Sequence, residues 1–386
     1  MRAGRFTVRS RAPAKIAEAL ADASARVLRK PGEGAALVFV TGPLRETLPE
    51  IAAAIAQVGC PVPVLIAGGG GVLDPDQEIL VGEAAAVGLV WDAGRAEALP
   101  LDIGVDPDDE EAAREAILRA LADRTGRGEP TALLFCRGEE PPEEALDALA
   151  EARVTPFLFG GGTSGPHGSA VVMPGSEPVI AANALLIIRG LRPPELRCSP
   201  ACRLLTPLYA VTEHQGPWVF ELDGRPALEV LREAKPSDEE LIFTVVAPEL
   251  GAPTHGGRPE LLLRKIEGVA PARGGVLLSV TPPPGSRIAL AMRSASAARA
   301  DLEAIARELL RDTRGSAPCF GVYLMSSMSR GVNLHREGSV DVRILRQRFP
   351  NMPWIGLGTA FELGPYAGRP AFHSHTGVLA LFTSPS

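Results

Sequence analysis

Apolar residues in the first half of the chain come in short, almost unbroken runs, such as A-L-V-F-V-T-G at residues 36–42 and T-A-L-L-F-C-R-G at residues 131–138. Runs of this kind are typical of strands covered on both faces. Between them, Leu48, Ile51 and Ile55 recur at helical spacing and predict a helix with one apolar face. The pattern therefore predicts an α+β (mixed α/β) fold.

This pattern occurs twice, about ninety residues apart. Residues 36–91 and 131–190 each predict a strand, a helix, a strand, a glycine turn and a further strand. The spacing is too long for a solenoid repeat and suits two halves of one domain. We therefore predict an internally duplicated first domain, residues 1–200, whose two copies superpose about a pseudo-twofold axis.

The character of the chain changes after a segment rich in proline and arginine, residues 192–203. Beyond it, Asp223-Gly224 signals a turn, and Ser294 is placed to cap a helix over residues 295–310. Short apolar runs continue to the last one, residues 373–382. We predict a second domain with a mixed sheet, residues 201–386.

The glycine turns, V-L-I-A-G-G-G-G-V-L and P-F-L-F-G-G-G-T-S-G, allow two interpretations. Successive backbone N–H groups could form an anion-binding nest, whose candidate residues are Gly69, Gly70, Gly161, Gly162 and Thr163. Alternatively, each strand leaves its sheet through positive φ, which glycine adopts at little cost. We favour the second interpretation and expect positive φ at Gly69 or Gly161.

Few other motifs indicate chemistry. Residues 160–165 match G-x-G-x-x-G, but Pro166 follows and no helix begins there, so we expect no dinucleotide cofactor. Cys198 and Cys202 form a lone C-x-x-x-C pair, which leaves a redox or metal role open, and we predict no metal site. The sequence contains no P-loop, nucleophile elbow or H-E-x-x-H motif.

Composition narrows the function further. The chain has 46% hydrophobic and 22% charged residues and a formal net charge of −7, without the basic excess that nucleic-acid binding requires. No apolar run approaches the ~20 residues of a membrane-spanning helix, and the first residues lack the apolar segment of a signal peptide. We expect a cytoplasmic protein.

Four segments of the second half carry a resemblance to a known family: E-L-D-G-R-P-A-L-E-V-L, M-S-S-M-S-R-G, W-I-G-L-G-T-A-F-E-L-G-P and H-S-H-T-G-V-L-A-L-F. With the duplicated first half, they resemble the FIST family, the F-box and intracellular signal transduction proteins, as a FIST N domain followed by a FIST C domain. The resemblance implies a sensor that binds a small molecule, with amino acids among the suggestions, and that acts through a separate signalling protein.

The match to the family motifs is uneven. Where the family's strand-end motif commonly has cysteine, this chain has Met328, although Arg330 and Gly331 match. Phe361 replaces the first glycine of a G-E-I-G-P turn, and Ser374 stands where the family has asparagine. The resemblance therefore implies no role for a thiol at this strand end.

Arg330 and Glu362 are the most suggestive pair, because each follows an apolar run and adjoins glycine. A guanidinium can hold a carboxylate and a carboxylate can accept an α-ammonium, so the pair suits an amino acid; alternatively, the two side chains bond to each other as a structural brace. We expect Arg330→Ala to leave the unliganded melting temperature nearly unchanged. The predicted ligand-binding residues are Ser326, Ser327, Arg330, Gly331, Glu362, Gly364 and His373.

The sequence therefore predicts a sensory protein that binds a small polar or anionic metabolite and catalyses no reaction. One alternative is a hydrolase or transferase that uses Arg330, Glu362 and His373, and it requires these three side chains to converge on one cavity. Another is a scaffold that docks a signalling partner through an exposed apolar patch.

Overall fold

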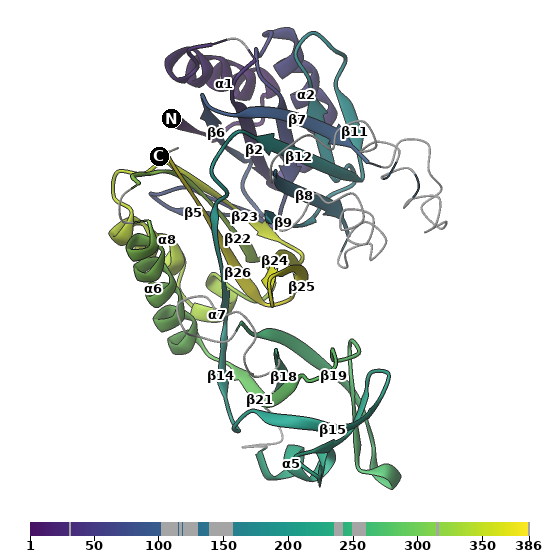
Figure 1. The fold of residues 1–386 in the computed structure, drawn as a ribbon. Helices are drawn as coiled ribbons and strands as arrows, with labels where there is room; N and C mark the ends of the chain where they lie inside the picture. The colour runs from purple at the N-terminus through teal and green to yellow at the C-terminus, as the bar shows by residue number, and fades with distance from the viewer. Residues whose placement is uncertain are drawn as a thin grey trace.

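The computed structural model describes residues 1–30, 32–101, 115, 118, 130–138, 157–234, 242–248, 260–313 and 316–384. Within these residues helices and strands combine in mixed sheets, which confirms the predicted α+β class. The inserted segment described below lies at the bottom of Figure 1, and the two chain ends lie near each other at its upper left.

One strand pattern defines the first repeat of the fold. Strands β2 (Ala35–Thr41) and β3 (Val64–Gly68) run parallel, and β6 (Ala85–Trp91) lies antiparallel between β2 and β1 (Ala3–Val8). Two helices, α1 (Pro13–Val27) and α2 (Leu48–Gln57), pack on the outer face of this sheet.

The same pattern occurs twice more. In the second repeat, β8 and β9 are parallel and β12 lies antiparallel between β8 and β7; in the third, β22 and β23 are parallel and β26 lies antiparallel between β22 and β13. The strands are β7 (Arg95–Pro100), β8 (Thr131–Arg137), β9 (Phe157–Thr163), β12 (Asn183–Arg189), β13 (Glu195–Pro200), β22 (Pro318–Ser326), β23 (Trp354–Thr359) and β26 (Thr376–Thr383). The sequence indicated a duplication, and the structure contains a triplication.

Each repeat contributes a hairpin that pairs with a strand in the sheet of another repeat. The hairpin of the first repeat pairs with β23 of the third, that of the second with β3 of the first, and that of the third with β9 of the second. The three hairpins are β4 (Gly71–Leu73) with β5 (Glu78–Leu80), β10 (Ser169–Val172) with β11 (Val179–Ala181), and β24 (Glu362–Tyr366) with β25 (Arg369–His373). This cyclic exchange has threefold rather than twofold symmetry.

Three backbone hydrogen bonds close the exchange at the centre of the molecule. In each, the backbone N–H of a residue one or two positions after β3, β9 or β23 donates to a carbonyl at the end of the equivalent strand in another repeat. They run from Gly70 to Gly358 (2.7 Å), from Ser164 to Gly68 (2.9 Å) and from Ala360 to Gly162 (2.9 Å). We call this arrangement the central ring.

The ring explains the glycine turns, and the explanation differs from the predicted one. Neither Gly69 nor Gly161 has positive φ, so that expectation was wrong. Glycine is needed because backbones approach closely: a Cβ at Gly69 would lie 2.5 Å from the Gly358 oxygen, and one at Gly161 would lie 2.4 Å from the Phe361 oxygen.

The third repeat is interrupted between β13 and α6 (Ala295–Asp312) by strands β14 to β21. Pairing of β21 with both β15 and β18 closes this segment into a small barrel, which we call the inserted barrel. Its elements are β14 (Cys202–Leu204), β15 (Tyr209–Gln215), β16 (Trp218–Leu222), β17 (Arg225–Pro226), α5 (Ala227–Ala234), β18 (Ile242–Ala247), β19 (Leu262–Ala270), β20 (Gly275–Leu278) and β21 (Arg287–Arg293).

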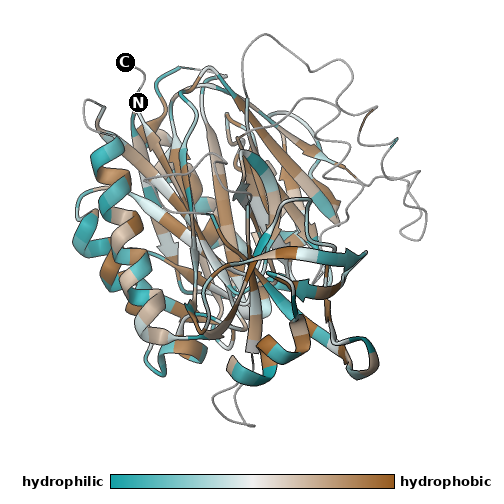
Figure 2. Ribbon diagram, turned by 60° about the horizontal axis from the view of Figure 1, so that its bottom comes forward, coloured by the Kyte–Doolittle hydropathy of each residue, from teal (hydrophilic) through white to brown (hydrophobic). Residues whose placement is uncertain are grey.

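The core lies between the three six-stranded sheets, each built mainly from the strands of one repeat. Their inner faces form one apolar cluster that includes Phe39 of the first repeat, Phe135 of the second and Phe320 of the third. Along β2, alternate residues face this cluster and the helices, which is why the run contains no polar position before its end. In Figure 2 hydrophobic positions, coloured brown, concentrate in the strands, whereas the helices carry more hydrophilic teal.

The predicted units 1–200 and 201–386 are joined by shared sheets. One sheet combines β13, β4 and β5 with β26, β22 and β23, and another combines β24 and β25 with β9, β8, β12 and β7. Two local predictions are confirmed. Asp223 and Gly224 form a turn with positive φ, and the Ser294 hydroxyl accepts the Ala297 N–H at the start of α6.

The central ring is testable with two alanine substitutions. Gly69→Ala places a Cβ against the Gly358 carbonyl, which the ring fixes, whereas Gly82→Ala meets open space. We expect Gly69→Ala to lower the free energy of unfolding by about 1–3 kcal/mol, the typical cost of overpacking, in chemical denaturation. Gly82→Ala serves as the control; equal effects of the two substitutions would contradict this account.

Candidate functional site

A pocket of about 770 Å³ lies beside the central ring, at the carboxyl ends of the first and second strands of all three repeats. Its lining residues are Arg45, Gly70, Gly71, Glu78, Leu80, Val81, Arg137, Gly138, Thr163, Ser164, Gly165, Met325, Ser326, Ser327, Met328, Arg330, Val332, Asn333, Gly358, Ala360, Ser374 and His375. Ligand sites commonly lie at strand carboxyl ends in sheets covered by helices. We call this cavity the central pocket.

Two arginines, Arg45 and Arg137, contribute positive charge to the lining of the central pocket. Arg45 donates from Nε to the Gly42 carbonyl (3.1 Å) and from Nη1 to the Ser164 hydroxyl (3.0 Å), and Arg137 donates from Nη1 to the Pro166 carbonyl (3.2 Å). Both arginines thus border the loop that follows β9. Neither has an ion-pair partner among the residues that the structure describes.

Part of the pocket lining is both apolar and exposed. Leu80, Val81 and Met328 are 42%, 45% and 77% exposed, and all three line the central pocket. In the described part of the chain only six large hydrophobic residues are 39% exposed or more, and half of them line this pocket. Leu80 ends β5 of the first repeat and Val81 follows it, while Met328 follows β22 of the third.

The structure brings together some of the predicted ligand-binding residues. Ser326, Ser327 and Arg330 line the central pocket, whereas Glu362, Gly364 and His373 are not among its lining residues. Gly331 has φ 56°, adjoins the Glu78 carboxylate and precedes the short helix α7 (Val332–His335). The trio Arg330, Glu362 and His373 therefore does not converge on this pocket, as the enzyme alternative requires.

Of the predicted nest, Gly70 and Thr163 line the pocket, but its N–H groups are already used. Gly69 donates to the Val40 carbonyl (2.9 Å), Gly70 to Gly358 and Gly162 to Phe361 (2.9 Å). Thr163 uses its hydroxyl on the Cys136 carbonyl (3.1 Å). The glycines thus bind backbone rather than offer donors to an anion.

Arg330 has a partner that the sequence analysis missed. Its Nε donates to the Asp341 carboxylate at 2.6 Å, and its Nη atoms donate to the carbonyl (2.7 Å) and hydroxyl (3.1 Å) of Ser199. Tyr323 and His335 also contact Asp341, at 2.7 and 3.2 Å. Burial by itself would raise the pKa of Asp341, but the Arg330 charge and these hydrogen bonds hold that pKa well below its usual range.

Glu362 is fully buried at the start of β24. It accepts hydrogen bonds from the Thr359 hydroxyl (2.8 Å) and the Thr376 N–H (3.2 Å), and burial raises its pKa to about 8 against these interactions. The single Thr359 hydroxyl hydrogen also faces the Met325 carbonyl at 3.1 Å. A protonated Glu362 can donate to Thr359, which then donates to Met325, so all three groups are satisfied when the acid is neutral.

His373 lies opposite Glu362 in the β24–β25 hairpin and is also fully buried. Burial, and then the charge of Arg264, lower its pKa to about 3. Its Nε2 lies 3.2 Å from the Pro365 carbonyl oxygen and 3.6 Å from Cys198 Sγ. Burial and the Arg264 charge outweigh the contact with the Pro365 carbonyl, so His373 is a neutral residue of the interior near neutral pH.

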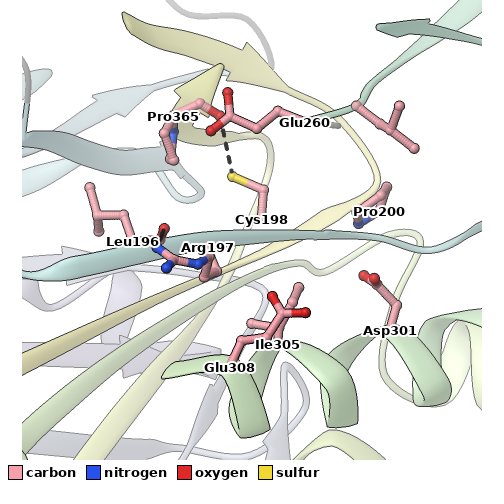
Figure 3. Close-up of a pocket in the computed structure, with 10 residues that line it drawn as sticks. Leu196, Arg197, Cys198, Pro200, Glu260, Asp301, Ile305, Glu308 and Pro365 are labelled. Carbon is pink, nitrogen blue, oxygen red and sulfur yellow. Dashed lines mark hydrogen bonds between the residues drawn. The ribbon is translucent and has the colours of Figure 1, made fainter. Parts of the chain in front are cut away.

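Cys198 borders a second, smaller cavity of about 150 Å³. Figure 3 shows its thiol directed at the Pro365 carbonyl (3.7 Å), with Asp301 and Glu308 of α6 on the opposite side of β13. Cys198 and Cys202 are both free thiols, and burial raises the pKa of each. Among the described residues, no three His, Cys, Asp or Glu side chains are arranged to hold a metal ion.

Comparison with known families agrees with the sequence resemblance. The model of the FIST N domain matches residues 34–225, and that of the FIST C domain matches residues 227–365. The chain belongs to the FIST family. FIST domains are sensor domains of signal-transduction proteins, and small ligands have been suggested for them.

Curated relatives add no activity. An uncharacterized protein of Mycobacterium tuberculosis is 29% identical over 194 residues, or 48% of this chain and 49% of its own length. An uncharacterized protein of Mycobacterium bovis is 29% identical over 207 residues, or 50% of this chain and 52% of its own length. The chain thus spans about half the length of the curated relatives it matches.

The two FIST segments do not coincide with the three repeats. They meet near residue 226, within β17 of the inserted barrel, so β13 falls in the FIST N segment and the rest of the third repeat in or beyond the FIST C segment. None of the helices in the described ranges has the length and apolar character that crossing a membrane requires.

Two ion pairs of equal length test the role of Arg330. Arg330→Ala leaves Asp341 as a buried charge without its partner, so we expect the free energy of unfolding to fall by about 3–5 kcal/mol. This reverses the expectation that the substitution would be nearly neutral. Arg343→Ala breaks the Arg343–Glu337 pair, also 2.6 Å long but 55% exposed on each side, and should cost about 1 kcal/mol or less. Comparable losses in urea denaturation would contradict this assignment.

Glu362 should make stability depend on pH. Its folded pKa lies above the unfolded value of about 4.5, so the free energy of unfolding falls as pH rises between those values. His373, whose folded pKa is depressed, opposes this fall below about pH 6.5. From pH 6.5 to 8 the wild type should lose about 1.5 kcal/mol relative to Glu362→Gln, because the slope of about 1.4 kcal/mol per pH unit halves as the pH reaches the folded pKa.

Glu362→Gln removes the ionisation and should abolish this loss in denaturation curves measured at both pH values. Glu337→Gln, at an exposed carboxylate, is the matched control and should retain the wild-type loss. A wild-type protein equally stable at pH 6.5 and 8 would show that Glu362 is charged throughout.

Proposed function

We propose that this protein is a sensor that binds a small polar or anionic metabolite in the central pocket and catalyses no reaction. The observation that carries the proposal is the pocket itself, since each repeat contributes strand-end residues to its wall. A ligand there contacts all three repeats at once. Its binding free energy can therefore alter how the repeats pack against one another.

The contacts of the serines favour binding over catalysis. Ser327 donates its hydroxyl to the Thr359 carbonyl (3.0 Å), and Ser326 accepts the hydroxyl of Ser329 (2.6 Å). A nucleophilic serine needs a base within hydrogen-bond reach, and these contacts supply none. The separation of Glu362 and His373 from the pocket lining weighs against the hydrolase or transferase alternative in the same way.

The inserted barrel provides a route from the pocket to a separate signalling protein. Arg293 of β21 donates to the Ser329 carbonyl in the turn that borders the pocket. Ser374, which lines the pocket, donates to the Leu263 carbonyl of β19 at 3.0 Å. A ligand that moves the turn at Ser329 or the segment at Ser374 would therefore shift the inserted barrel. A partner protein that binds the surface of the barrel can respond to this shift.

A thermal-shift screen of small organic acids and amino acids tests this function. A ligand at 100 times its Kd should stabilise the protein by about 2.7 kcal/mol. Asn333→Trp should remove the shift, because Asn333 is exposed and its side chain lines the pocket, so the indole fills the cavity without displacing a buried residue. Arg29→Trp, at an exposed site outside the pocket lining, is the control. A shift that survives Asn333→Trp would locate binding elsewhere.

A further inference from the structure

We infer that the ligand is an organic carboxylate with an apolar body and no ammonium group. This deepens the proposed function and rests on it. The carboxylate binds between Arg45 and Arg137, and the apolar body lies against Leu80, Val81 and Met328. The structure assigns this class because two arginines and a set of exposed apolar side chains, supplied by different segments, line the same pocket.

Arg45 and Arg137 have N–H donors that no group in the described residues accepts. A guanidinium carries five N–H donors, and the contacts described above use two on Arg45 and one on Arg137. Both side chains border the loop over residues 164–168: the Arg45 stem adjoins Gly165, and the Arg137 Cβ adjoins Gly168. Two arginines at one loop, without a carboxylate partner in the described part of the chain, suit an anionic group that can accept bidentate hydrogen bonds.

The other charged side chains of the pocket lining already have hydrogen-bond partners. Arg330 is paired with Asp341. Glu78, the one acidic residue of the lining, accepts the backbone N–H groups of Ser339 (3.0 Å) and Val332, at the start of α7. An α-ammonium would therefore meet the repulsion of two arginines, and the Glu78 carboxylate already accepts two backbone N–H groups. This arrangement disfavours an amino acid.

The apolar part of the pocket lining is more extensive than a small hydrophilic anion could cover. Met325 and Val332 extend the surface formed by Leu80, Val81 and Met328 into the pocket. Large side chains left in water at a cavity mouth lose that exposure when an apolar group covers them, which is favourable. A volume of about 770 Å³ falls in the range of pockets that enclose whole small molecules.

Four related compounds separate the contributions. The probe 3-phenylpropionate has both the charge and the apolar body; propionate lacks the body, 3-phenylpropionamide lacks the charge, and L-phenylalanine adds an ammonium. We expect isothermal titration calorimetry to give 3-phenylpropionate a Kd at least tenfold lower than each of the other three. L-Phenylalanine binding as tightly as the probe, or propionate doing so, would overturn the inference.

Variants locate the two ends of the probe. Arg137→Gln, at an exposed side chain, and Arg45→Gln should each weaken 3-phenylpropionate at least fivefold and leave 3-phenylpropionamide unchanged, while Met328→Asp should weaken both compounds. Arg29→Gln is the matched control and should have no effect. Unchanged binding of 3-phenylpropionate by both Arg→Gln variants would overturn the assignment.

The failure of this inference is distinguishable from failure of the proposed function. If the four compounds do not bind, but another compound of the screen stabilises the wild type and not Asn333→Trp, the sensor function stands and the ligand class is wrong. If no compound stabilises the protein through the central pocket, both fail.

Discussion

The central ring is the interaction on which the rest of the structure depends. Three backbone hydrogen bonds of 2.7–2.9 Å tie the strand ends of each repeat to the next, and they form only where the backbones approach more closely than a Cβ permits. The ring fixes where each chain segment leaves its own sheet. It thereby directs the three hairpins into neighbouring sheets and leaves a cavity beside the strand ends.

Buried polar side chains that are not part of the central ring stabilise the strand ends and turns around it. Thr41, Thr163 and Thr359 each donate a hydroxyl to a backbone carbonyl near a strand end, and Glu362 joins the third of them to the β25–β26 connection. The Arg330–Asp341 pair does the same for the segment after β22, reaching β13 through Ser199. Because such groups are costly to leave unpaired, they select one arrangement of the turns around the pocket.

A pocket built from three repeats is suited to sensing. The two arginines that lack an ion-pair partner among the described residues come from the first and second repeats, and the exposed apolar residues of the lining come from the first and third. A ligand that satisfies both must bridge segments that are far apart in the sequence, so its binding energy acts on the packing of the whole molecule. The inserted barrel forms hydrogen bonds with the turns that border the pocket. A change in packing caused by a ligand would therefore reach a surface away from the pocket.

The sequence by itself determined the local features: the α+β class, the helix cap at Ser294, the turn at Asp223, and the strand ends at which Ser326 and Ser327 meet the pocket. Each depends on residues a few positions apart. The G-G-T of residues 161–163 has a counterpart in the G-T of residues 358–359, so a signal for the third repeat was present, but the inserted barrel separates β13 from the rest of that repeat. Only the tertiary structure decided that Arg330 pairs with Asp341 rather than Glu362, and that Arg45 and Arg137 share one wall. Those contacts arise from the exchange of hairpins around the ring, which no local pattern specifies.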